Sequence, residues 1–230
     1  MKNDSIAMLE AVRELAAAVS ARSGEMESAR RLPADLLAQL TTAGCFRMFV
    51  PKSHGGLELD VPSSMEIIEK LASADGSTRC AVGIGIAQRA VDEIVSLAGT
   101  NKRRLYAQSS VAKSRLFQYR LGHAATSLRA ARNLLRSEAE QVWASAVTER
   151  PATPADRSRV MGAVTWSAHT AAAVVDACYT AGSGTSLYES SPLQLCLHDI
   201  HTLTQHAAVA ETWLERSGSS ILGRDSGFAV

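Results

Sequence analysis

Apolar residues recur along most of the chain at intervals of three and four residues, which is the spacing of amphipathic helices. In the first such segment, residues 5–20, apolar side chains occupy one face at every turn. The same pattern predicts further helices over residues 33–44, 62–72, 78–97, 103–148, 156–180 and 192–217. Pro51 and the Gly55–Gly56 pair mark an irregular loop before residue 62. No segment shows the alternation of a strand, so the sequence predicts an all-α protein.

The helices differ in length, and this difference predicts the architecture. Shorter helices come first, and the long ones that follow are expected to pack as an antiparallel four-helix-type bundle. Alanine is abundant in residues 156–180 and suits close packing in the core of such a bundle. Thr153 can cap that helix, and Gly44 can end the helix that begins near Pro33.

Composition excludes several classes of function. The 230 residues include 24 basic and 23 acidic side chains, a net charge of +1. Binders of nucleic acid or anionic membranes normally carry a basic surplus, so we expect neither partner. No apolar stretch of about 18 residues predicts a membrane span, and the N-terminus shows no export signal. We therefore expect a cytoplasmic protein whose four widely spaced cysteines are reduced and packed as small hydrophobes.

The main cluster of chemically active residues lies on the last predicted helix. Asp199 and His206 are seven residues apart, so they share one stripe of that helix with Thr202. Histidine titrates near neutral pH, and His206 on an inward stripe is a candidate general base with Asp199 beside it. The alternatives are a hydrogen-bonded polar residue inside the bundle and, for Asp199, an ion pair with Arg129 or Arg132.

Other histidines and aromatic residues are weaker candidates. His198 and His201 are three residues apart but no H-E-x-x-H pattern accompanies them, so we expect no metal site. Tyr119 and His123 on the long helix could line a substrate pocket together with His198 and Thr202. The alternative is that such residues belong to the core or to a subunit interface.

Two stretches of the sequence follow the pattern of a known family. Residues 32–60 read LPADLLAQLTTAGCFRMFVPKSHGGLELD and are followed by ADGST at 74–78. They resemble the N-terminal helical domain of the acyl-CoA dehydrogenase superfamily, in particular its flavin-dependent monooxygenase branch. The chain from IAQRAVD at 86–92 onward is similar to the C-terminal helix bundle of that branch. Shared marks are AAR at 130–132, QVW at 141–143, GSG at 182–184, SPLQ at 191–194, Asp199 and Gln205-His206. The resemblance implies two domains, residues 1–85 and 86–230.

The chain departs from this family at one large and two small points. The family places a β-domain between its two helical domains, whereas here residues 81–85 run directly into residues 86–89. The resemblance implies that this β-domain normally covers one side of the flavin ring and binds part of the substrate. Leu195 and His198 stand where the branch commonly has basic residues, which weakens a site for phosphate or carboxylate groups.

The resemblance also assigns a role to the loop Gly182-Ser183-Gly184. It matches a family loop that approaches the flavin pyrophosphate of a partner subunit, and these three residues are the candidate contacts to FAD or FMN. The alternative is a glycine cap between two helices. At His206, the resemblance points to the position where some monooxygenases carry a catalytic base.

Three functions are compatible with these observations. The first is an enzyme that has lost flavin and uses the vacated helical pocket for acid–base chemistry on an apolar organic or acyl substrate. Isomerisation, dehydration or cyclisation would then be carried by His206 and Asp199. The second is a flavin-dependent dehydrogenase or two-component monooxygenase that holds FAD or FMN at a subunit interface. The third is a non-catalytic helical partner of a longer relative. In each case we expect a homodimer or homotetramer, because family bundles assemble in these forms.

Overall fold

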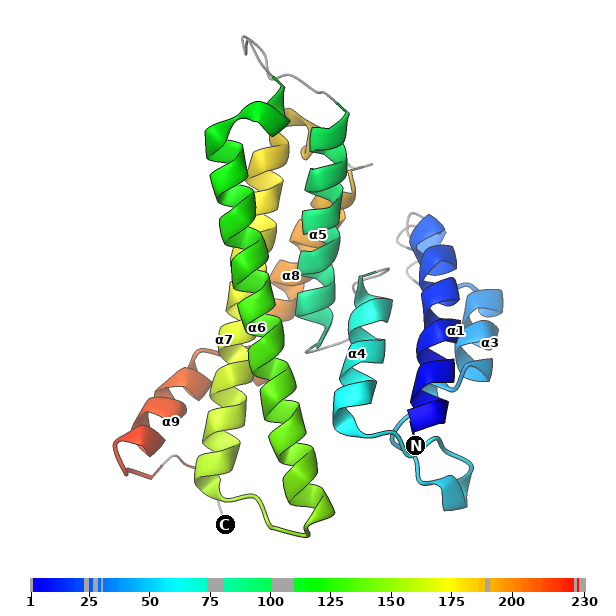
Figure 1. The fold of residues 1–230 in the computed structure, drawn as a ribbon, viewed down its shortest axis with the longest axis vertical. Helices are drawn as coiled ribbons and strands as arrows, with labels where there is room; N and C mark the ends of the chain where they lie inside the picture. The colour runs from blue at the N-terminus through cyan, green and yellow to red at the C-terminus, as the bar shows by residue number, and fades with distance from the viewer. Residues whose placement is uncertain are drawn as a thin grey trace.

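A computed structural model describes residues 2–22, 25, 26, 29, 31–73, 81–100, 110–188, 191–225 and 227. A group of shorter N-terminal helices lies beside a bundle of long helices (Figure 1). The elements are α1 (Lys2–Ala21), α3 (Ala34–Thr42), α4 (Val61–Ala72), α5 (Ala81–Gly99), α6 (Arg115–Val147), α7 (Pro154–Gly182), α8 (Pro192–Thr204) and α9 (Thr212–Ile221). The described residues contain no β-strand. The predicted all-α fold, with N-terminal helices and a C-terminal antiparallel bundle, is therefore confirmed.

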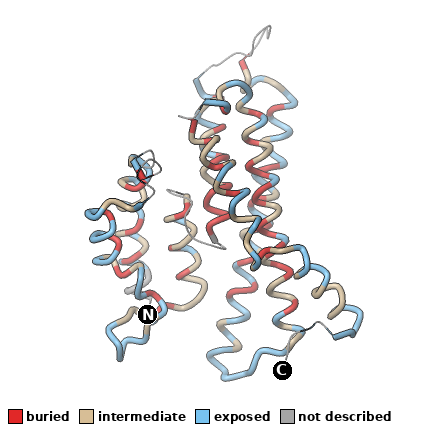
Figure 2. The backbone as a smooth tube through the Cα atoms, turned by 180° about the vertical axis from the view of Figure 1, so that it is seen from behind, coloured by how far each residue is buried: buried red, intermediate tan, exposed pale blue. Residues whose placement is uncertain are grey.

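Helix α7 is the centre of the bundle and packs against α5, α6, α8 and α9. The core between these helices contains many small side chains, and Ala131 and Ala171 are completely buried. Small side chains let helix axes approach closely, and larger ones such as Leu128 and Ile200 fill the remaining space. Figure 2 shows that the buried positions lie on the inward faces of the helices, as an amphipathic pattern requires.

Helix α4 connects the two groups of helices. On one side it packs against α1, where Val12 and Ile67 belong to a separate small core. On the other side it approaches α5 so closely that a Cβ atom at Gly85 would lie 2.6 Å from the Glu69 carbonyl oxygen. This contact fixes the position of α4 relative to the bundle.

The helix ends follow local signals that the sequence contains. Gly44 has φ +86° after α3, a conformation that favours glycine. Thr153 and Asp156 form a reciprocal capping box at the start of α7, as predicted for Thr153. The hydroxyl and the backbone N–H of Thr153 both donate to the Asp156 carboxylate, which lowers the pKa of Asp156 to about 2. The stabilisation that this contact provides is present above the ordinary carboxylate pKa and is lost as pH falls through about 2.

Two predicted helices differ from the structure. The single helix expected over residues 192–217 is wrong, because the chain forms α8, a short 3₁₀ turn at Ala207–Val209, and then α9. His206 caps the 3₁₀ turn, and the Trp213 indole N–H donates to the Ala207 carbonyl at 2.7 Å. Helix α6 begins later than predicted, at Arg115, where the Ser114 side chain accepts from the Phe117 N–H.

The predicted boundary between residues 85 and 86 lies inside α5, and the division into domains at this point stays a prediction. Burial raises the pKa of the Cys178 and Cys196 thiols to about 12, so both are packed as inert hydrophobes. Cys80 lies outside the described residues. None of the described helices has the length and apolar character needed to cross a membrane.

Candidate functional site

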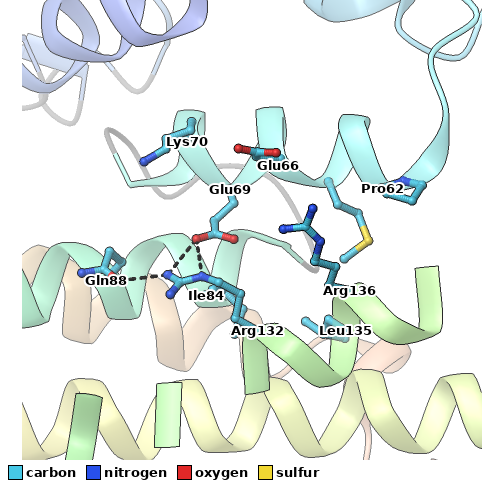
Figure 3. A pocket seen from close by; sticks show the side chains of 10 residues that line it. Pro62, Glu66, Glu69, Lys70, Ile84, Gln88, Arg132, Leu135 and Arg136 are labelled. Carbon is cyan, nitrogen blue, oxygen red and sulfur yellow. Dashed lines mark hydrogen bonds and ion pairs between the residues drawn. The ribbon is translucent and has the colours of Figure 1, made fainter. Parts of the chain in front are cut away.

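A cavity of about 320 Å³ lies where α4 meets α5 and α6. Helix α4 forms one wall and the other two helices form the opposite wall (Figure 3). The residues that line it are Pro62, Met65, Glu66, Glu69, Lys70, Ile84, Gln88, Arg132, Leu135 and Arg136. Its volume is at the lower end of the range of about 300–1,000 Å³ found for small-molecule sites. The cavity therefore suits a ligand the size of one or two rings.

One side of the cavity is formed by a network of charged and polar side chains that joins three helices. The Arg132 guanidinium on α6 lies 2.7 Å from the Glu69 carboxylate on α4 and donates to the Gln88 side-chain oxygen on α5 at 2.9 Å. Gln88 in turn donates to Asp92 at 2.9 Å. Glu69 and Arg132 are each less than one third exposed, so water screens this pair less than a surface pair. The network holds Arg132 in a fixed orientation at the cavity wall.

The rest of the lining combines an apolar floor with further charges. Ile84 and Leu135 are buried, at 2% and 4% exposure, and form an apolar surface next to this network. Arg136 extends from α6 towards α4, on the side of the cavity where Glu66 lies (Figure 3). The lining contains no histidine, serine, cysteine or tyrosine. Its chemistry is suited to binding and orienting a ligand more than to nucleophilic attack.

The structure places His206 at the end of α8, half-buried, where its ring has a structural role. The Nδ1 atom accepts a hydrogen bond from the Ala208 backbone N–H at 3.1 Å. A neutral imidazole that accepts at Nδ1 carries its proton at Nε2, so Nε2 is a hydrogen-bond donor in this conformation. A role as general base would require the ring to give up this cap. The catalytic assignment of His206 stays a prediction.

Two substitutions distinguish the capping role of the His206 side chain from a role of its imidazole in the reaction. His206→Ala removes the acceptor and should lower the free energy of unfolding by about 0.5–1 kcal/mol. His206→Asn keeps an acceptor at a similar position and should remain close to wild type in urea denaturation. Equal stability of all three proteins would contradict the capping role, whereas loss of turnover in both variants would identify an imidazole that acts on substrate or cofactor.

The Asp199 carboxylate is mostly buried, at 20% exposure, and lies 3.4 Å from the His198 ring. The suggested pairing of Asp199 with Arg132 is wrong, because Arg132 is held by Glu69 and Gln88. Since the helix ends at Thr204, the stripe that was to carry Asp199, Thr202 and His206 is interrupted before His206. The role of Asp199 as a partner of His206 stays a prediction.

The four predicted pocket residues lie on two separate helices. Tyr119 and His123 are exposed on α6, with ring centroids 6.4 Å apart. His198 and Thr202 are exposed on α8. Helices α6 and α8 are not neighbours, because both pack against α5 and α7 instead. These four residues therefore do not enclose a common pocket within one chain, and their role as pocket residues stays a prediction that would need a second subunit.

The loop Gly182-Ser183-Gly184 has three different environments. A Cβ atom at Gly182 would lie 2.1 Å from the Ser186 hydroxyl oxygen, so this glycine serves packing within the chain. Ser183 has φ +56°, which strains a residue with a side chain. Gly184 is exposed, and a Cβ atom there would meet nothing within 4 Å. Ser183 and Gly184 are exposed, so a group outside the chain can reach them, and Gly182 is partly buried. The role of these three residues as contacts to FAD or FMN stays a prediction.

The sequence pattern alone did not indicate the cavity, although Gln88 and Arg132 lie in segments that resemble the family. Arg132, Leu135 and Arg136 have the spacing of one helix face, which is the signal that could have found them. Only the approach of α4 shows that this face borders a cavity. Within the described residues, no three His, Cys, Asp or Glu side chains gather as possible metal ligands.

Comparison with known proteins identifies the family to which this chain belongs. The family model for "Acyl-CoA dehydrogenase, C-terminal domain" matches residues 77–211, and that for "Acyl-CoA dehydrogenase, N-terminal domain" matches residues 2–106. The chain belongs to the acyl-CoA dehydrogenase family. The two matches overlap over residues 77–106, a range that includes α5.

Two curated relatives that the chain matches are named as a monooxygenase and as the oxygenase component of a hydroxylase. Indole-3-acetate monooxygenase of Pseudomonas putida is 28% identical over 144 residues, which span 62% of this chain and 36% of that protein. The oxygenase component of p-hydroxyphenylacetate 3-hydroxylase of Acinetobacter baumannii is 30% identical over 79 residues, 34% of this chain and 19% of that protein. This chain thus matches about a third of the length of the first relative and about a fifth of the length of the second.

Solved structures share the fold at low sequence identity. XiaF from Streptomyces sp., in complex with FADH2 and glycerol, superposes with a TM-score of 0.92 at 15% identity, covering 98% of this chain and 97% of that chain. The HsaA monooxygenase from M. tuberculosis superposes with a TM-score of 0.85 at 15% identity, covering 96% and 99%. These superpositions show that the fold is shared, and the family models confirm the predicted resemblance to the acyl-CoA dehydrogenase superfamily.

Proposed function

We propose that this chain is a component of a flavin-dependent monooxygenase that uses reduced flavin to hydroxylate a small aromatic substrate. The observation that carries the proposal is the sequence similarity to monooxygenases, which covers 62% of the chain in the indole-3-acetate enzyme. The cavity of about 320 Å³ supports it, because its size suits a ring-sized substrate. We therefore propose flavin-dependent hydroxylation in place of the flavin-free acid–base reaction that the sequence first suggested.

The described residues offer a partial site for the flavin. The cavity between α4, α5 and α6 is too small for a whole dinucleotide, and the described residues include no strand that would cover a ring. The exposed residues Ser183 and Gly184 are suited to contact a phosphate group of a flavin that a second subunit holds. The Ser183 backbone N–H already donates to the Thr180 carbonyl, so this contact would fall to the Ser183 hydroxyl and to Gly184. Bound reduced flavin would supply the activation of dioxygen, while this chain's residues would hold the substrate. The proposal therefore includes a homo-oligomer in which FAD or FMN lies at the subunit interface.

Anaerobic titration with reduced FAD and reduced FMN tests this proposal directly. We expect saturable binding with one flavin per chain, and mixing the loaded protein with oxygen and indole-3-acetate or p-hydroxyphenylacetate should yield a hydroxylated product. Sedimentation of the loaded protein should show a dimer or tetramer. If neither flavin binds in either redox state, the proposal is overturned.

The flavin-free enzyme is the second candidate, and the lack of any strand among the described residues is the observation that favours it. Without a cover, one face of a bound flavin would be open to water, and reduced flavin would react with oxygen unproductively. Turnover of a substrate by protein that binds no flavin would select this candidate. The third function, a non-catalytic partner, would be selected by stable binding to a longer relative without turnover by this chain.

A further inference from the structure

Two arginines one turn apart on α6 border the same cavity, and their environments differ. Like charges at this spacing repel each other, so each guanidinium needs a partner. Glu69 on the opposite wall neutralises Arg132 at 2.7 Å. Arg136 contacts Glu140 at 3.3 Å, and both of these side chains are more than half exposed. An exposed pair of this kind is weak, so the Arg136 guanidinium remains available to a stronger anionic partner.

The charges of the lining leave the cavity with a positive excess. Lys70, Arg132 and Arg136 face two carboxylates, Glu66 and Glu69. Within the part of the chain that the structure describes, Glu66 and Lys70 form no ion pair. Once the Glu69–Arg132 pair is set aside, two cations and one carboxylate remain among the lining residues, and Glu140, outside the lining, balances Arg136 only through the exposed ion pair described above. A ligand with a single negative charge inside the cavity would take the place of Glu140 as the partner of Arg136.

The apolar part of the lining defines the rest of the ligand. Ile84 and Leu135 are almost fully buried, and Met65 is partly buried beside them. A ring or short aliphatic chain placed on this surface would remove apolar area from water, which favours binding. A guanidinium is suited to pair with a carboxylate through two parallel hydrogen bonds.

We propose that this cavity binds a small monocarboxylate with an aromatic or aliphatic body, and that Arg136 binds the carboxylate while Ile84, Met65 and Leu135 pack against the body. The binding of a carboxylate in this cavity does not depend on the proposed function. Only the identification of that carboxylate as the substrate rests on the proposed function. Glu66 acts as a specificity residue, because a second negative charge on the ligand would lie near its carboxylate and be repelled. Dicarboxylates are therefore excluded and monocarboxylates accepted.

Calorimetric titration of the flavin-free protein tests the inference. The probes are 1-naphthylacetate, phenylacetate and hexanoate, and the neutral control is 1-naphthylacetamide, which has the same shape without the charge. We expect 1-naphthylacetate to bind about tenfold more tightly than its amide, since a hydrogen-bonded ion pair is lost in the amide. Arg136→Gln should abolish this preference, and Glu66→Gln should strengthen binding of the carboxylate.

Arg129→Gln is the matched control. Arg129 is an exposed arginine on the same helix, outside the lining and about 10 Å from Arg136 along the axis. Its replacement removes the same charge and should leave the affinity unchanged. Both arginines are exposed, so neither variant should lose its fold, and circular dichroism checks this.

Several results would overturn the inference. They are equal affinity for acid and amide, equal effects of Arg129→Gln and Arg136→Gln, or no saturable binding of any probe at millimolar concentration. Because these titrations contain no flavin, their outcome is separate from that of the flavin titration. If the protein binds the carboxylate but no flavin, this inference stands and the proposed function is overturned. If it binds flavin but none of the carboxylates, the proposed function stands and this inference is overturned.

Discussion

Replacing Gly85 by alanine should destabilise the protein by about 3 kcal/mol, because the new methyl group has no space. At this position a Cβ atom would lie 2.6 Å from the Glu69 carbonyl oxygen and 2.8 Å from both the Ala72 Cβ and the Ser73 backbone nitrogen. Two of these atoms belong to the backbone of α4 and of its C-cap residue Ser73, and a backbone atom cannot give way by a side-chain rotation. The substitution should therefore push α4 away from α5.

Gly122→Ala is the matched control for this prediction. Gly122 also lies inside a long helix, but a Cβ atom there would meet nothing within 4 Å. Alanine should stabilise α6 by about 0.5–1 kcal/mol, since glycine loses more conformational freedom on folding. Urea denaturation measures both variants. Because α4 forms one wall of the cavity, Gly85→Ala should also weaken binding of 1-naphthylacetate, whereas Gly122→Ala should not. Equal stability of Gly85→Ala and wild type would contradict the close contact between α4 and α5 at Gly85.

Replacing Arg159 by methionine should cost about 3 kcal/mol, because it leaves a buried carboxylate without its cation. The Glu138 side chain on α6 is 9% exposed and forms an ion pair with Arg159 on α7. Arg159 also lies 3.6 Å from Asp156, but that carboxylate keeps its hydrogen bonds from Thr153. The loss of stability should therefore come mainly from Glu138.

The double variant Glu138→Leu with Arg159→Met tests this cause. It removes the buried charge together with its partner, and an apolar pair of similar volume in place of a buried ion pair is often neutral in stability. We expect urea denaturation to show that the double variant recovers most of the stability lost in Arg159→Met. A double variant as unstable as the single one would show that packing of the Arg159 side chain, and not charge, is the cause.

Several features of the fold were predictable because they depend on residues close together in the sequence. The apolar spacing predicted the helices, and the positions of Gly44 and Thr153 predicted where two of them end or begin. The last helix was predicted wrongly for a local reason as well. Its apolar pattern continues past Thr204, but the hydrogen bonds of His206 and Trp213 to the backbone favour a 3₁₀ turn there.

The candidate site could not be predicted in the same way. His206 and Asp199 attract attention in the sequence because their side chains are reactive, yet one caps a turn and the other lies beside an exposed histidine. Arg132 and Arg136 look like ordinary surface residues of a long helix. Their significance depends on α4, which is about sixty residues away in the sequence and supplies Glu66 and Glu69 to the same cavity.

The sequence by itself determined that this protein is all-α, that it has a bundle of long helices, and that it resembles the acyl-CoA dehydrogenase superfamily. These properties follow from periodicity, caps and short motifs, which act over a few residues. Only the tertiary structure decided which polar side chains share a cavity and which are apart. The physical reason is that a cavity is formed where faces of distant helices meet, and at Gly85 that meeting depends on a close contact between two backbones.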